Sequence, residues 1–195
     1  MKKIFNQANM LHIGLTVAIL LSGYSFAQGT TTEVTLLAGY TLLQETTDEE
    51  RIQNALSGGP AVISEGARVM DWPTRANPEG PGVELIELRP GDNGWTCIPD
   101  LLDTPGNDPM CLNDIYLQAL IARHNNEAPP STGIGIGYML QEGTPKGSPP
   151  HMMVYVPESE ADYANYPTEP GPTPWVMFPD TPYAHLMITM VEGAE

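Results

Sequence analysis

The chain has 195 residues, of which 41% are hydrophobic, and its 24 acidic and 8 basic residues give a formal net charge of −16 at neutral pH. A surface this acidic repels phosphate backbones, which excludes nucleic acid as an expected partner and leaves a metal ion, a small ligand or a cationic protein. The length suits one domain with a sizeable core.

Residues 1–27 have the features of a signal peptide. Lys2 and Lys3 supply positive charge, an apolar run over residues 11–21 is too short to span a bilayer, and residues 25–27 (Ser-Phe-Ala) resemble a cleavage site. We therefore expect a periplasmic or secreted protein with no membrane span after signal removal. An uncleaved N-terminal anchor is the alternative, and the short apolar run argues against it.

Residues 28–46 are rich in threonine and are expected to form an N-terminal arm or a first strand, before a single α+β domain over residues 47–195. Thr47 and Glu50 have the spacing of a capping box, so they predict a short helix that ends at Gly58. Further along the chain, the residues from Cys111 to about His124 repeat apolar side chains with a helical period.

The remaining apolar runs are short and rich in strand-forming residues. Two of them, 83–88 and 95–98, are separated by Pro90-Gly91-Asp92-Asn93-Gly94 and together predict a β-hairpin. The other runs predict strands over residues 61–64, 67–72, 133–140, 152–156, 175–178 and 184–191. Strands outnumber helices and do not alternate with them, so we expect an α+β fold, loop-rich, in which two helices pack on an antiparallel sheet.

The two cysteines, Cys97 and Cys111, are best explained as one disulfide in an exported protein. A redox pair or a metal site is the alternative, but the spacing is not Cys-x-x-Cys and two thiols alone do not make a zinc site. A disulfide here closes a loop of about 15 residues and stabilises the fold by roughly 3 kcal/mol.

Two predicted strands begin with the same pattern, His-x-Met. Alternate residues of a strand share a face, so His151 lies beside Met153 and His185 beside Met187. Imidazole and thioether ligands suit copper, especially Cu(I), so these four residues are candidate metal ligands and copper is the candidate cofactor. The alternative is packing, because the intervening residues of both strands are apolar too and buried histidine is common in such strands.

The first interpretation of function is therefore a small exported binding protein without enzymatic activity, which holds a metal ion or small ligand near these residues. The sequence supports two other interpretations. In a small exported hydrolase, His151 or His185 acts as a general base oriented by an acid. In a cell-envelope interaction protein, the acidic segment 157–174, rich in proline and tyrosine, contacts the partner. The acids considered for the hydrolase are Asp71, Asp92, Asp100 and Asp180.

Four segments resemble a recurring pattern in a family of exported bacterial hypothetical proteins. They are Trp-Thr-Cys-Ile-Pro-Asp (95–100), Asn-Asp-Pro-Met-Cys (107–111), Pro-His-Met-Met (150–153) and Thr-Pro-Tyr-Ala-His-Leu-Met (181–187). The resemblance covers roughly residues 61–190, whereas the threonine-rich segment lies outside it. It implies that these four segments belong to one common unit, and it implies no particular activity.

Overall fold

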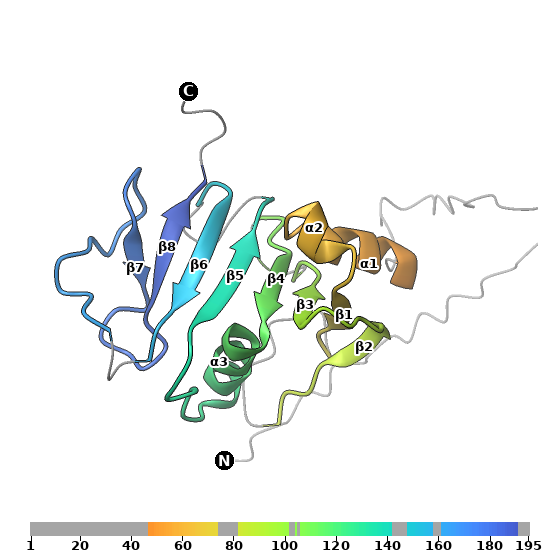
Figure 1. Ribbon diagram of the computed structural model, residues 1–195, viewed down its shortest axis with the longest axis horizontal. Coiled ribbons are helices and arrows are strands. Elements are labelled where there is room, and N and C mark those ends of the chain that lie inside the picture. The colour runs from red at the N-terminus through yellow and green to blue at the C-terminus, as the bar shows by residue number, and fades with distance from the viewer. Residues whose placement is uncertain are drawn as a thin grey trace, which may run out of the picture. The chain divides into compact units, whose positions relative to one another are not determined.

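The computed structural model describes residues 47–73, 82–101, 104, 106–141, 148–157 and 161–190. The predicted signal peptide and the segment 28–46 lie outside the described residues. The described elements follow in chain order (Figure 1): α1 (Asp48–Leu56), α2 (Ala61–Ser64), β1 (Arg68–Asp71), β2 (Ile86–Arg89), β3 (Trp95–Ile98), β4 (Met110–Asn113), α3 (Asp114–Asn125), β5 (Gly135–Met139), β6 (His151–Tyr155), β7 (Trp175–Met177) and β8 (His185–Thr189).

The eight strands form one sheet in the order β2-β1-β3-β4-β5-β6-β8-β7. Every neighbouring pair is antiparallel except β1 and β3, which run parallel. The predicted α+β class, the mainly antiparallel sheet and the disulfide are confirmed. The helical part differs from the prediction, because the sheet dominates and the described residues contain three helices.

The capping box at the start of α1 is confirmed. The Thr47 hydroxyl accepts a hydrogen bond from the Glu50 backbone N–H, and the Glu50 carboxylate accepts one from the Thr47 backbone N–H. The strand predicted over residues 61–64 is wrong, since these residues form α2. Pro60 precedes this turn, and its carbonyl accepts hydrogen bonds from the backbone N–H groups of Ile63 and Ser64, which is a local arrangement that overrides the strand propensity of the run.

The predicted β-hairpin between residues 83–88 and 95–98 is also wrong, because β2 and β3 do not pair with each other. Both pair with β1, which lies between them. The connection folds back against β1: a Cβ atom on Gly91 would lie 2.0 Å from the backbone nitrogen of Arg68, and Asp92 donates a hydrogen bond to the Gly66 carbonyl. The proline and glycine residues of segment 90–94 suit this connection as well as they suit a hairpin turn.

The predicted helix from Cys111 begins three residues later than expected. Residues 110–113 form β4, and α3 starts after Asn113, whose side-chain oxygen accepts hydrogen bonds from the backbone N–H groups of Tyr116 and Ile136. The same amide therefore caps the helix and joins it to β5. The helix predicted from sequence periodicity included residues of β4, because the apolar residues of this strand directly precede those of the helix.

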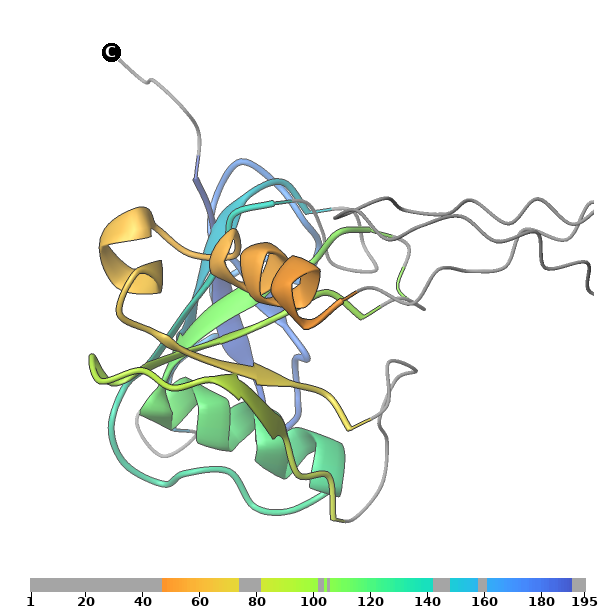
Figure 2. The same cartoon turned by 90° about the vertical axis from the view of Figure 1, so that its right-hand side faces the viewer.

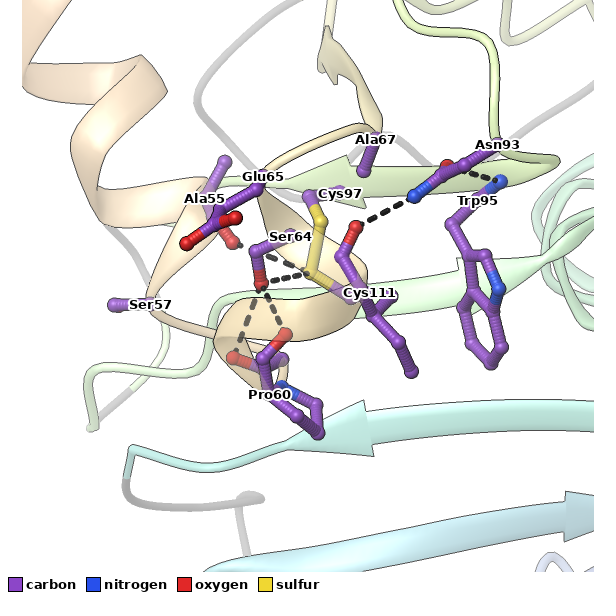
Figure 3. Close-up of a disulfide and its surroundings, with 12 residues drawn as sticks. Ala55, Ser57, Pro60, Ser64, Glu65, Ala67, Asn93, Trp95, Cys97 and Cys111 are labelled. Carbon is purple, nitrogen blue, oxygen red and sulfur yellow. Dashed lines mark hydrogen bonds between the residues drawn. A yellow bond between two sulfur atoms is a disulfide. The ribbon is translucent and has the colours of Figure 1, made fainter.

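The disulfide joins Cys97 of β3 to Cys111 of β4, which are directly opposite each other in the antiparallel register (Figure 3). Helices α1 and α2 cover it. The Cys111 sulfur lies 3.6 Å from the Ala55 carbonyl oxygen and 3.8 Å from the Ser64 hydroxyl. The first of these is a packing contact, since a disulfide sulfur carries no hydrogen to donate.

The two long helices cover opposite faces of the sheet (Figure 2). We call the face under α1 the disulfide face; its core is Ala55, Ala67, Val69, Cys97 and Cys111. We call the face under α3 the pocket face; its core contains larger side chains, among them Leu112, Tyr116, Met153, Tyr155, Trp175 and Met187.

Close contact between α3 and the sheet depends on a glycine of β5. A Cβ atom on Gly135 would lie 3.0 Å from both the Cα and the backbone nitrogen of Tyr116. Without a side chain at this position, the first turn of α3 rests directly on the strand. The rest of the helix then forms one wall of a cavity.

Candidate functional site

An apolar cavity of about 340 Å³ lies on the pocket face, between α3, strands β4 to β8 and the adjoining loops. Methionine and aromatic side chains supply much of its wall, including Trp72, Met110, Met139, Met153, Tyr155 and Met177. Aromatic rings give a rigid wall, whereas methionine adapts its shape to different ligands. A concave apolar cavity of this size is typical of a small-molecule site.

The four predicted metal ligands lie on neighbouring strands and share the pocket face. Met153 of β6 is directly opposite Met187 of β8, whereas His151 is opposite Thr189 and His185 is opposite Tyr155. The thioethers are therefore central, and the two histidines lie at opposite ends, four residues or roughly 13 Å apart along the strands. Of these four residues, Met153 and His185 line the cavity.

Both imidazoles make the same local hydrogen bond. The Nδ1 atom of His151 lies 2.7 Å from the Pro149 carbonyl oxygen, and the Nδ1 atom of His185 lies 2.9 Å from that of Tyr183. A carbonyl only accepts, so each Nδ1 carries the hydrogen and donates it, which leaves the lone pair on Nε2 of the neutral ring. Neither Nε2 has a hydrogen-bond partner among the described residues, and both are buried.

Burial keeps both imidazoles neutral. Burial is the main cause that lowers the pKa of His185 to about 4; the charge of Arg123 acts in the same direction, and the hydrogen bond to the Tyr183 carbonyl opposes it. Burial also lowers the pKa of His151, again against a carbonyl hydrogen bond. At neutral pH each Nε2 is therefore a hydrogen-bond acceptor or a metal ligand, and His185 presents this chemistry in the cavity wall.

The geometry around the imidazoles differs from that of a general base oriented by an acid. Within the described residues, the hydrogen-bond partner of each Nδ1 is a backbone carbonyl and not a carboxylate. Asp71, one of the candidate acids, instead forms a salt bridge of 2.7 Å with Arg51. The hydrolase interpretation stays a prediction with no carboxylate–imidazole pair to support it in this part of the chain.

Sequence reasoning missed three polar residues of the cavity. Arg123 comes from the last turn of α3, and its guanidinium lies 4.3 Å from the centre of the Phe178 ring. Trp72 follows β1; it is 3% exposed, and its indole N–H has no acceptor among the described residues. Asp108 precedes β4. A basic residue at a helix C-terminus and a tryptophan after a strand are too common to have singled these residues out.

Asp108 contributes a carboxyl group that is neutral over part of the physiological pH range. Burial raises its pKa to about 7, and a hydrogen bond to the Asp100 side chain, together with the charge of that carboxylate, acts in the same direction. The Asp108 backbone N–H also donates to Asp100. Below neutral pH, the protonated Asp108 adds no negative charge to the cavity.

The acidic segment 157–174 adjoins a second hollow. This hollow measures about 660 Å³ and is more polar than the first, and its wall includes Asp162, Tyr163, Tyr166 and Asp180. It carries no polar side chain that is both buried and unpaired among the described residues. The interaction role of this segment stays a prediction.

Within the described ranges, no group of three or more His, Cys, Asp or Glu side chains is arranged to hold a metal ion. Such groups contain no methionine, so the ligand set of two histidines and two methionines stays a prediction. No helix in the described part of the chain is long and apolar enough to cross a membrane. Comparison of the chain with protein-family models, curated proteins and solved structures found no significant match.

Proposed function

We propose that this protein is an exported binding protein that holds a small, largely apolar ligand in the cavity under α3. The observation that carries the proposal is an apolar cavity whose wall contains a buried imidazole nitrogen, that of His185, with no partner among the described residues. Leaving such an atom without a partner costs about 1–3 kcal/mol, a cost that a ligand with a hydrogen-bond donor would remove. Apolar walls with a few polar atoms are typical of ligand sites.

The size of the cavity limits the ligand. A volume of about 340 Å³ corresponds to about eleven water molecules in the liquid, so it accommodates on the order of 10 to 15 non-hydrogen atoms. A one- or two-ring aromatic compound or a short alkyl chain has this size. The expected signal peptide and the disulfide support a role outside the cytoplasm.

A neutral probe tests the binding proposal. We expect 2-naphthylacetamide to bind the folded protein with a micromolar to millimolar Kd, measured by calorimetry. Ala119→Leu fills the cavity from α3 and should abolish binding, whereas Gln118→Leu, at the neighbouring exposed position, should leave it unchanged. Absence of binding to the wild type, or equal binding by both variants, would contradict the proposal.

A soft-metal site is the second candidate, favoured by the state of the two imidazoles. Histidines that bind metals usually donate Nδ1–H to a carbonyl or carboxylate and bind through Nε2, which is the arrangement of both His151 and His185. Titration of Cu(I) and Cu(II) into the wild type and a His151→Ala/His185→Ala variant tests it. Equal or absent binding in both proteins would exclude the metal site.

A further inference from the structure

Arg123 and Arg51 differ in their salt-bridge partners. Arg51 forms salt bridges with two acidic residues, Asp48 and Asp71. Arg123 forms no salt bridge with a described residue, although acidic residues outnumber basic ones by 24 to 8. Its guanidinium stacks on Phe178 in the wall of an apolar cavity. The helix dipole and the aromatic ring explain why a cation is tolerated there, but they supply no acceptor for the N–H groups of its guanidinium.

The groups around Arg123 favour an anionic ligand. His185 and Tyr116 both feel its positive charge, and His185 is neutral. Trp72 adds an N–H donor that has no acceptor among the described residues. Asp108 is the one acidic residue that lines the cavity within the described ranges, and burial keeps it protonated at mildly acidic pH. At mildly acidic pH, Arg123 therefore gives the cavity wall a fixed positive charge.

We propose that the ligand is a small apolar carboxylic acid, bound as its carboxylate, with Arg123 as the ion-pair partner and the methionine and aromatic walls holding the apolar body. The inference rests on the proposed binding function. A guanidinium matches a carboxylate with two parallel hydrogen bonds, and the pairing is strong where water is excluded. A single guanidinium neutralises a monoanion, which favours a carboxylate over a doubly charged phosphate.

The test compares two probes of nearly the same shape, 2-naphthylacetate and 2-naphthylacetamide. Calorimetry at pH 6 measures the affinity of the folded protein for each probe. The naphthalene ring fills the apolar part in both cases, and only the acetate carries charge. We expect the acetate to bind at least tenfold more tightly than the amide. Equal affinities would overturn the carboxylate inference and leave the binding function intact. Failure of both probes to bind would contradict the binding function itself and the inference with it.

Three variants test whether Arg123 causes the preference for the acetate. Arg123→Met keeps an apolar side chain over Phe178 and should reduce the acetate-to-amide affinity ratio to about one. Arg123→Lys keeps the charge and should retain most of the ratio. Arg68→Gln is the matched control: it removes one positive charge outside the cavity and should leave the ratio unchanged. An equal loss in Arg68→Gln and Arg123→Met, or a ratio that Arg123→Met leaves unchanged, would overturn the assignment. If Arg123→Met does not fold, Arg123→Gln replaces it, with the same expected ratio of about one.

Discussion

The disulfide face and the pocket face are built from the same strands but differ in how they are filled. On the disulfide face, small residues and a cross-strand disulfide allow α1 to pack closely. On the pocket face, methionine and aromatic side chains surround a cavity, and within the described part of the chain an imidazole nitrogen and an indole N–H there have no partner. Closely packed interiors tolerate few voids. This difference is the basis of our proposal that one face serves stability and the other binds the ligand.

Removal of the disulfide should give the largest effect and act on stability alone. The bridged residues are 14 apart in the chain, so a Cys97→Ala/Cys111→Ala variant should lose about 3 kcal/mol of unfolding free energy. Urea denaturation measures the loss. Under native conditions, the Kd for 2-naphthylacetamide should stay within about twofold of the wild type. Loss of binding by a folded variant would show that the two faces are not separate.

Acid should destabilise the pocket face through His185. Its folded pKa of about 4 lies below its ordinary value of 6.5. The buried, neutral His185 therefore makes its full contribution to the free energy of unfolding above pH 6.5, and this contribution is lost as the pH falls from about 6.5 through 4. We expect a loss of roughly 2–3 kcal/mol over this range. Asp108 acts in the opposite sense, because its raised pKa contributes stability at low pH that is lost as the pH rises toward 7.

The wild type should therefore be compared with His185→Gln, in which Asp108 is unchanged. Unfolding free energies from urea denaturation at pH 7, 5.5 and 4 give the two pH profiles. The difference in stability between wild type and variant should shrink or change sign as the pH falls. Parallel profiles would contradict the burial of a neutral His185.

A methyl group on Gly135 should disturb the pocket face by separating α3 from β5. The added Cβ would lie 3.0 Å from two backbone atoms of Tyr116 and from the Cβ of Tyr155. Gly135→Ala should cost about 1–3 kcal/mol of stability and weaken probe binding. Gly171→Ala, where an added Cβ meets nothing within 4 Å, should change stability by less than about 0.5 kcal/mol. Similar effects of both changes would mean that the close approach of α3 is unimportant.

The smallest effect is expected from the contact between the Tyr116 hydroxyl and the Met153 sulfur, which measures 3.1 Å and is buried. Tyr116→Phe removes a hydrogen bond to a weak acceptor and leaves no strongly polar atom unpaired. We expect a loss of about 0.5–1 kcal/mol in thermal or urea unfolding, with probe binding retained. A loss above about 2 kcal/mol would show that this contact organises the wall of the cavity.

Local signals in the sequence predicted the elements that depend on neighbouring residues. The capping box at Thr47, the glycine-rich strand over β5 and the alternation of β6 and β8 lead to the observed structure because each depends on a few adjacent side chains. The pairing of β1 with both β2 and β3 was not predictable in this way. It depends on a close approach between Gly91 and Arg68, which are far apart in sequence.

The candidate site shows the same limit. The His-x-Met pattern predicted that His151 shares a face with Met153 and His185 with Met187, and the alternate burial in β6 and β8 agrees with this. It left open whether the two strands are neighbours. It did not predict the register, which pairs the methionines and separates the histidines. The cavity also depends on residues from α3 and the loops, such as Arg123, which no local pattern links to these strands. Tertiary packing therefore decides which of the predicted residues line the cavity.

Two adjacent methionines of β6 provide the most direct test of the central claim, that the cavity under α3 binds a small apolar ligand. Met153 lines the cavity, whereas Met152 lies on the opposite face of the same strand. NMR of the protein labelled with ¹³C at its methionine methyl groups, titrated with 2-naphthylacetamide, reports on both. We predict saturable shifts for Met153 and the other cavity methionines and no shift for Met152. A shift of Met152 with Met153 unchanged would place the ligand on the other face and contradict the claim.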